Sequence, residues 1–128
     1  MIQKITISNF FSIREPLEVS FEASKEKQYG EDWITQVGNT RLLKALILYG
    51  ANGSGKTNIL FALDFLREAI IRFPMDEDDD FSYMRFALDP EYSDKNSVFD
   101  LYFFRGDIRY RYYLEISPTR ITKEELRV

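Results

Sequence analysis

Apolar and polar residues alternate in two stretches near the start of the chain. Residues 2–9 alternate so that Ile5 and Ile7 fall on one side, which we expect to be buried. A second period-two run follows, with Pro16 at its entrance, a position that suits the beginning of a strand. The apolar members of this run are Leu17, Val19 and Phe21. We predict two antiparallel strands joined across residues 11–15.

Two further pairs of alternating runs predict β-hairpins. Residues 33–37 and 40–44 flank Gly38-Asn39, a two-residue sequence that suits a tight turn with positive φ. Residues 98–104 and 108–116 are rich in aromatic side chains, and Arg105-Gly106-Asp107 joins them. One face of the last run is apolar throughout and carries Ile108, Tyr110, Tyr112, Leu114 and Ile116. We expect this face to be buried.

A continuous apolar run and a helical pattern occupy the middle of the chain. Ala45 to Tyr49 has no polar position and is typical of a strand buried on both faces. After a glycine-rich stretch, apolar residues recur at helical spacing until Pro74. These residues are Ile59, Leu60, Leu63, Leu66, Ala69, Ile70 and Phe73. We therefore predict a buried strand, a tight loop and one main helix in succession.

The remaining segments lack a clear period. Residues 24–32 are charged and include a glycine, which indicates an exposed loop, and residues 76–80 are five consecutive acids, which we expect to be a solvated run rather than a cation site. In residues 81–96 we expect Asp89-Pro90 to make a turn. The side chains expected to pack in this segment are Phe81, Met84 and Phe86.

The glycine-rich stretch reads GANGSGKT and fits the pattern GxxxxGK[ST] of a phosphate-binding loop. Its predicted context, a strand before and a helix after, is the one that this motif requires. Glycine allows turns in which backbone N–H groups face the α- and β-phosphates, and the helix directs its positive end toward the same anion. Lys56 is expected between the β- and γ-phosphates, and Thr57 is the expected Mg²⁺ ligand. The predicted nucleotide-binding residues are Gly50, Ala51, Asn52, Gly53, Ser54, Gly55, Lys56, Thr57 and Asn58.

Composition narrows the function further. The 128 residues are enough for one domain, and 45% of them are hydrophobic, which suffices for a single core. The net charge of −4 gives no general attraction for nucleic acid. Without histidine or cysteine, hydrolytic chemistry here has to rest on carboxylates and a metal. No targeting or membrane-spanning run is visible, so a cytoplasmic, globular protein without membrane contact is the expectation.

The second hairpin raises an alternative, because arginines beside aromatic residues can hold single-stranded nucleic acid. The basic residues are Arg105, Arg109 and Arg111, but Asp100, Asp107 and Glu115 lie close to them in sequence. Aromatic residues alternating with arginine are also common in half-buried strand pairs. We therefore favour a structural role for this hairpin.

The order of these segments resembles a known group of ATPases. The segments ITISNF, SFEAS and LYGANGSGKTN appear in the order found at the beginning of SMC, RecF and ABC-like ATPases. Within that group the chain is most similar to bacterial AAA-labelled ATP-binding proteins of the overcoming-lysogenization-defect type, many of them linked to phage defence. The stretches FALDPEYSDKNSVFDLYFF, IRYRYYLEI and ITKEEL resemble that subgroup as well.

The resemblance implies a fold and a function. It implies an α/β chain, the N-terminal lobe of an ABC-type P-loop ATPase head, with antiparallel hairpins and one main helix after the phosphate loop. The ligands that it implies are ATP and Mg²⁺, with ATP held between two ATPase heads, so a homodimer or other self-association is expected. DNA contact is expected only through a longer protein.

The resemblance also assigns a role to the N-terminal segment. Asn9, Phe10 and Ser12 match a segment that lies near the nucleotide base and phosphates in relatives. Phe11 departs from the pattern, because several relatives carry arginine there. Stacking of Phe10 or Phe11 on the base is one interpretation, and packing in the core is the other.

Several parts of such an ATPase have no counterpart in this sequence. The sequence lacks four motifs of such ATPases: the Asp-Glu ending of a Walker B strand, the signature Ser-Gly turn, the metal-sensing Gln after the loop and the switch His. The short run Val98-Phe99-Asp100 is apolar and ends in an acid, but it lacks the following Glu. We therefore expect residues 1–128 to be a single partial lobe of a longer ATPase, with a natural short relic as the alternative. Hydrolysis by the lobe alone should be slow or absent.

Two other functions remain as alternatives. One is a nucleotide sensor or dimerisation module that binds without hydrolysis. The other is a guanine-nucleotide switch or small kinase, although the tetrapeptide Asn/Thr-Lys-x-Asp that usually gives guanine specificity is missing from the sequence.

Overall fold

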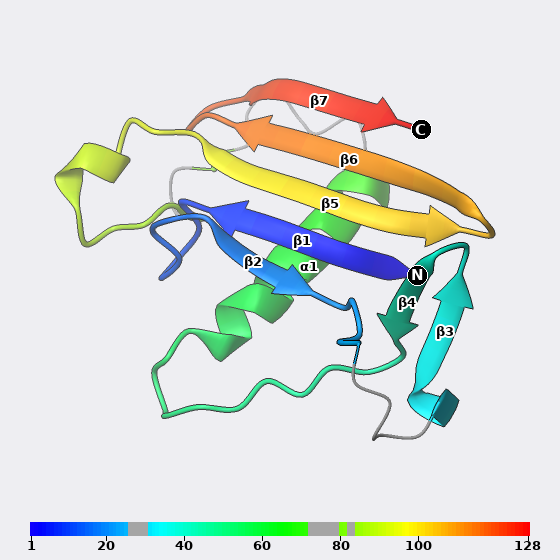
Figure 1. The fold of residues 1–128 in the computed structure, drawn as a ribbon. Coiled ribbons are helices and arrows are strands. Elements are labelled where there is room, and N and C mark those ends of the chain that lie inside the picture. Colours follow the sequence, from blue (N-terminus) through cyan, green and yellow to red (C-terminus); the bar gives the residue numbers. More distant parts are fainter. Residues whose placement is uncertain (26–30, 72–79, 82–83) are drawn as a thin grey trace.

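A five-stranded antiparallel sheet forms the body of the molecule (Figure 1). The computed structural model describes residues 1–25, 31–71, 80–81 and 84–128. The strand order is β2-β1-β5-β6-β7, so β2 and β7 form the edges. The strands are β1 (Ile2–Ser8), β2 (Leu17–Ser20), β5 (Ser97–Arg105), β6 (Ile108–Ile116) and β7 (Ile121–Arg127).

The alternation of residues 2–9 becomes strand β1, which pairs with β2 on one side and with β5 on the other. Ile5 lies opposite Val19 of β2 and opposite Leu101 of β5. Both Ile5 and Ile7 are fully buried. The predicted pairing of the first two strands and the buried face of β1 are therefore confirmed. The pairing of β1 with β5 also joins two segments that are far apart in the sequence.

Helix α1 (Lys56–Ile71) lies across one face of the sheet (Figure 1). Its buried residues are Ala62, Leu66 and Ala69. They belong to a single core that includes Ile5, Ile7, Phe10, Phe99, Leu114 and Ile116 of the N-terminal segment and the sheet. The helix is the predicted one, but two of the apolar residues at its helical spacing, Leu60 and Ile70, are 59% and 54% exposed.

The predicted hairpins are both present. Strands β3 (Ile34–Val37) and β4 (Thr40–Leu43) form a separate two-stranded sheet that follows a short 3-10 helix η1 (Glu31–Trp33). The N–H of Leu43 donates to the carbonyl of Phe21 at 2.7 Å, which ties this hairpin to the end of β2. Strands β5 and β6 form the aromatic hairpin, in which Tyr112, Leu114 and Ile116 are buried. Ile108 at the start of β6 is 50% exposed, so the expectation that this face is buried throughout is corrected.

The prediction of a buried strand at residues 45–49 is wrong. This segment is extended but belongs to no strand of the described chain, and it runs beside the rest of the molecule toward α1 (Figure 1). Ile47 is 85% exposed and Tyr49 is 92% exposed. A strand needs a neighbour to pair its N–H and C=O groups, and no described strand takes that position.

The segments around the hairpins also have defined structures. Asp89 caps a 3-10 helix η3 (Pro90–Tyr92), in agreement with the predicted turn, and Phe81 and Met84 are buried as expected. Strand β7 was not predicted, because its sequence is mostly charged, as is common for an edge strand. The acidic residues 76–79 and Phe73 lie outside the described residues. The α/β architecture with antiparallel strands and one main helix is confirmed.

Candidate functional site

The GANGSGKT loop (residues 50–57) joins the extended segment to the first turn of α1. Gly53 has a φ of +79° and Gly55 a φ of +85°, in the left-handed region where other residues are strained. The loop is mostly exposed. The backbone therefore needs glycine at these two positions, and the sequence has glycine at both.

Glycine is needed at Gly55 for a second reason, which is space. A Cβ atom there would lie 2.7 Å from the Ser12 hydroxyl oxygen, closer than real Cβ contacts allow. At Gly50 a Cβ would lie 3.2 Å from the hydroxyl of Ser54, and at Gly53 it would meet nothing within 4 Å. At Gly53 only the backbone path requires glycine, whereas at Gly55 an added Cβ would also displace the Ser12 hydroxyl.

The Lys56 ammonium curls back over the loop. Its Nζ lies 2.9 Å from the carbonyl oxygen of Gly50, 2.7 Å from that of Ala51 and 3.3 Å from the hydroxyl of Ser54. An ammonium has three N–H groups, so these acceptors can hold it in one position. The positive charge is thereby kept at the mouth of the loop.

Thr57 and Asn58 follow in the first turn of α1. The backbone N–H of Asn58 donates to the carbonyl of Gly55 at 3.0 Å, which closes the turn at the helix start. The Thr57 side chain is exposed and its hydroxyl has no hydrogen-bond partner within the described part of the chain. The Asn58 side-chain amide donates to the Ser12 hydroxyl oxygen at 2.6 Å.

A cavity of about 230 Å³ lies against this loop. A second cavity of about 430 Å³ adjoins it and extends between the turn after β1 and the end of the extended segment, reaching Leu17 and Tyr49. Ser12, Ser54, Gly55 and Lys56 line both cavities. The remaining residues around the smaller cavity are Gly53, Thr57 and Asn58. Most of the sequence-predicted binding residues therefore surround one space.

The residues assigned through the N-terminal segment are not brought together. Ser12 lines both cavities, but Phe10 is fully buried against Phe99, with ring centroids 5.3 Å apart. The interpretation that Phe10 stacks on a base is therefore wrong. Phe11 is half-buried and faces Phe61 of α1 at a centroid distance of 6.0 Å.

Asn9 has a structural position rather than a place at the loop. It is 2% exposed, and its side-chain amide donates to the carbonyls of Tyr92 and Lys95 at 3.1 and 2.8 Å. Its side-chain oxygen accepts the N–H of Phe86 at 3.1 Å. These bonds tie the end of β1 to residues 86–95, so the expectation that Asn9 lies beside the nucleotide is corrected.

The one acid considered as a Walker B residue lies elsewhere. Asp100 accepts two hydrogen bonds from Arg111, at 2.8 and 2.9 Å, across the β5–β6 pair. This contact raises the pKa of Arg111 above its ordinary value. Arg109 donates to the Gln3 side chain at 2.8 Å. Two of the three arginines, Arg109 and Arg111, are thus engaged with neighbouring strands, in agreement with a structural role.

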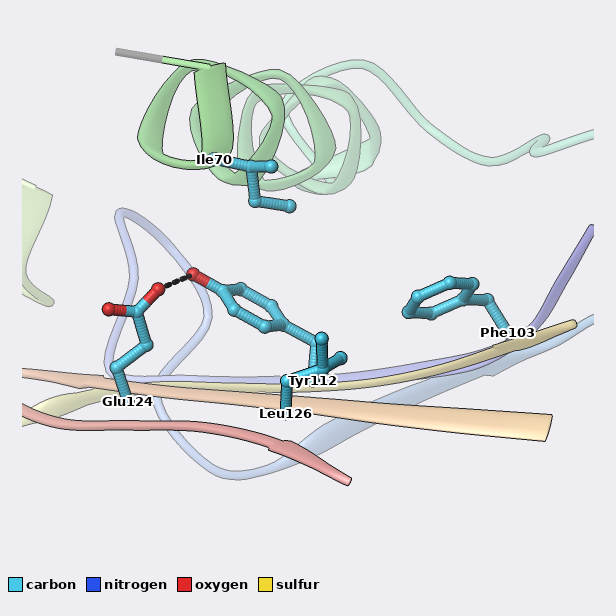
Figure 2. A pocket seen from close by; sticks show the side chains of 5 residues that line it. All are labelled: Ile70, Phe103, Tyr112, Glu124 and Leu126. Atoms are coloured by element: carbon cyan, nitrogen blue, oxygen red, sulfur yellow. Dashed lines mark hydrogen bonds between the residues drawn. The ribbon is translucent and has the colours of Figure 1, made fainter. Parts of the chain in front are cut away.

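A further groove of about 460 Å³ opens between the end of α1 and the sheet (Figure 2). Ile70 lies on the helix side, and Phe103, Tyr112 and Leu126 lie on the sheet side. The Tyr112 hydroxyl donates to the Glu124 carboxylate at 2.7 Å (Figure 2). Burial, and then this hydrogen bond, raise the pKa of Tyr112. The groove is mainly apolar and contains one polar pair.

No group of three or more acidic, His or Cys side chains that could hold a metal ion occurs in residues 1–25, 31–71, 80–81 and 84–128. Within the same ranges, no helix has the length and apolar character needed to cross a membrane.

Comparison with known families decides the class of this domain. Residues 46–128 match the family described as "AAA domain, putative AbiEii toxin, Type IV TA system". The match covers about two thirds of the chain. The chain belongs to this family. A comparison of this AAA domain with curated proteins found no match.

The matched part of the AAA domain contains the GANGSGKT loop, α1 and strands β5 to β7. Membership confirms the predicted P-loop ATPase class. The closer relationship to SMC, RecF and ABC-like ATPases stays a prediction.

One relationship in the site of the AAA domain could not be read from the sequence. Ser12 and Asn58 were both named as candidates, but the hydrogen bond between them joins residues 46 positions apart. No spacing rule relates such distant residues. The Tyr112–Glu124 pair was missed for a simpler reason, because β7 itself was not predicted.

Proposed function

We propose that this AAA domain binds ATP with Mg²⁺ through residues 50–58. The observation that carries the proposal is the position of the Lys56 ammonium, held by the loop at the rim of a cavity that the glycine-rich loop and the start of α1 surround. A fixed cation, backbone N–H groups and the positive end of a helix are the groups that recognise a polyphosphate.

The residues present fit this ligand. Lys56 would contact the phosphates, the loop backbone from Gly50 to Gly55 would surround them, and the unengaged Thr57 hydroxyl would be a ligand of the metal. When bound, Mg²⁺ would neutralise part of the phosphate charge. The protein groups would bind and orient the nucleotide.

We further propose that the domain is the N-terminal lobe of an ABC-type ATPase head and supplies half of a composite site. The family description supports a role in toxin–antitoxin or abortive-infection systems. Such a role agrees with the resemblance to proteins linked to phage defence. Hydrolysis would then depend on groups that the other half of the composite site supplies. Any DNA contact belongs to the longer protein.

We also propose that the domain self-associates, as a head in a nucleotide-bound dimer would. Support comes from the apolar residues of the extended segment, of which Ile47 and Tyr49 are almost fully exposed. Unpaired extended backbone with apolar side chains favours pairing with another chain.

Titration calorimetry of ATP with Mg²⁺ into the purified chain tests nucleotide binding. The Lys56→Ala variant should lose binding and keep its fold, because its side chain contacts only the loop. Lys44→Ala is the matched control, since the Lys44 ammonium also donates to a backbone carbonyl, that of Asp32, but away from the loop. Equal ATP affinity in the wild type and Lys56→Ala would contradict the proposal.

A further inference from the structure

The groove between the end of α1 and the sheet lies away from the GANGSGKT loop (Figure 2). Helix α1 begins at Lys56 beside that loop, whereas Ile70 on the groove is next to the last residue of the helix. At 1.5 Å per residue the two positions are about 21 Å apart along the helix axis. The volume of about 460 Å³ falls in the range of about 300–1,000 Å³ that is typical of small-molecule sites. The groove is therefore large enough for a ligand of its own.

The walls of the groove are apolar. Ile70 of α1 is 54% exposed and Leu126 of β7 is 63% exposed, and both line the groove. Phe103 of β5 is held in place by the ring of Tyr110, which stacks on it at a centroid distance of 5.3 Å. An apolar ligand here would remove exposed surface of Ile70 and Leu126 from water, which is the main source of affinity in such a site.

One end of the groove offers only hydrogen-bond acceptors (Figure 2). The Tyr112 hydroxyl gives its single hydrogen to Glu124 at 2.7 Å, and the phenol keeps this proton because burial and the carboxylate raise its pKa. The second oxygen of Glu124 has no hydrogen-bond partner within the described part of the chain. An ionised carboxylate accepts hydrogen bonds and cannot donate them. A polar group bound at this end must therefore be a donor.

No cation of the described chain pairs with the charge of Glu124. Strand β7 carries Lys123 and Arg127, and both pair with Glu125, at 3.2 and 2.8 Å. Side chains alternate across a strand, so these three residues lie on the face of the sheet opposite to the groove. Among the described residues that line the groove there is no lysine or arginine. A carboxylate beside apolar walls and without a cation favours a ligand with a positively charged head.

We propose that this groove is a binding site for a small hydrophobic amine. The apolar body of the ligand packs between Ile70 and Leu126, over the rings of Phe103 and Tyr112, and its ammonium group donates to the free oxygen of Glu124. Tyr112 is also a positioning residue, because its hydroxyl fixes the orientation of that carboxylate. The site is separate from the proposed nucleotide site and does not depend on it.

Three probes of similar size test this chemistry by NMR titration of the isotope-labelled full chain. Phenethylamine, phenethyl alcohol and phenylpropionate carry a cationic, a neutral and an anionic head on the same aromatic body. The amine should shift the backbone amide signals of residues 124–126. Because Glu124 is exposed, the amine should bind about tenfold more tightly than the alcohol, the lower limit for a hydrogen bond to a charged group, and phenylpropionate should bind most weakly. Equal affinities of the three probes, or amine-induced shifts only outside the groove, would overturn the proposal.

A matched pair of carboxylate variants locates the ammonium group. Glu124→Gln keeps an acceptor for Tyr112 but removes the charge, and should reduce the amine affinity about tenfold while leaving the affinity for the alcohol unchanged. Glu125→Gln changes the neighbouring carboxylate on the other face of the sheet and should leave the affinities of all three probes unchanged. An amine affinity that is the same in Glu124→Gln and the wild type, or reduced equally in both variants, would contradict the role of Glu124.

A variant on the helix side makes the test independent of the stability of Glu124→Gln. Ile70→Lys is at an exposed position of α1 and places a cation of the protein in the groove. Its ammonium should compete for Glu124 and abolish binding of phenethylamine. Amine binding of wild-type strength in Ile70→Lys would show that the ligand does not occupy this groove.

Discussion

The hydroxyl of Tyr112 on β6 donates a hydrogen bond to the carboxylate of Glu124 on β7. Tyr112 is buried, and burial together with the neighbouring carboxylate opposes loss of its proton. The folded chain therefore holds this proton more tightly than the unfolded chain, in which a tyrosine ionises near pH 10.

This pair predicts a loss of stability in alkali. Because the folded-state pKa of Tyr112 is raised, its contribution to stability is complete below pH of about 10 and declines above it, by about 1.4 kcal/mol per pH unit. Urea unfolding between pH 8 and 11 measures the decline. Tyr112→Phe should remove most of this decline in stability. Tyr113→Phe is the control and should retain most of the decline, because the phenol of Tyr113 is less deeply buried than that of Tyr112. Equal slopes in the two variants would contradict the assignment to Tyr112.

The two glycines with positive φ in the loop predict unequal effects of alanine. In Gly53→Ala the added Cβ meets no atom within 4 Å, so the variant should suffer only backbone strain. This strain should lower the free energy of unfolding, or the fraction of chains with the loop in its binding conformation, by about 1 kcal/mol. Gly55→Ala adds a contact of 2.7 Å with Ser12 and should weaken ATP binding further. Calorimetric affinities of both variants check the order, and a larger loss in Gly53→Ala would contradict the described loop geometry.

Asp100 should matter for stability and not for nucleotide binding. Asp100→Asn removes the negative charge opposite Arg111 and replaces one of the two acceptor oxygens by an NH2 group. Since both side chains are only partly exposed, we expect a loss of about 1 kcal/mol in unfolding free energy. The Mg²⁺ dependence of ATP affinity should be the same as in the wild type. Altered Mg²⁺ dependence would instead point to Asp100 as a metal ligand.

The exposed segment at 45–49 predicts concentration-dependent association. Light scattering on the wild type should show a mass above that of one chain, and Ile47→Lys should shift it toward the monomer by placing a charge in the apolar segment. Leu88→Lys is a suitable control, because Leu88 is 86% exposed but lies outside this segment. A wild type that remains monomeric at high concentration would contradict the proposed self-association.

Much of the fold was predictable because local patterns and tertiary positions agree. The alternation around Ile5 and Ile7 and the helical spacing of Leu66 and Ala69 each indicate the face that becomes buried, and the turn residues of both hairpins mark where the chain reverses. The run 45–49 misled for a physical reason. A continuous apolar segment indicates a strand with neighbours on both sides, and the neighbours are a property of the assembled sheet rather than of the segment.

The candidate site divides in the same way. The GANGSGKT loop is local, so its residues and its glycine positions could be named from sequence. The contact of Ser12 with Asn58 depends on how the turn after β1 is held against α1, and the burial of Phe10 depends on β5. These relationships arise only from packing, which a local pattern does not report.

The pairing of β1 with β5 has a consequence for biosynthesis. The backbones of Met1 and Phe104 exchange hydrogen bonds at 2.6 and 2.7 Å, although 103 positions separate them. During translation, residues 50–57 are synthesised before β5 (Ser97–Arg105), the strand that completes the sheet. The turn that carries Ser12 lacks its buried support until then, so the nascent chain cannot present an ordered site to nucleotide before most of the sequence has been made.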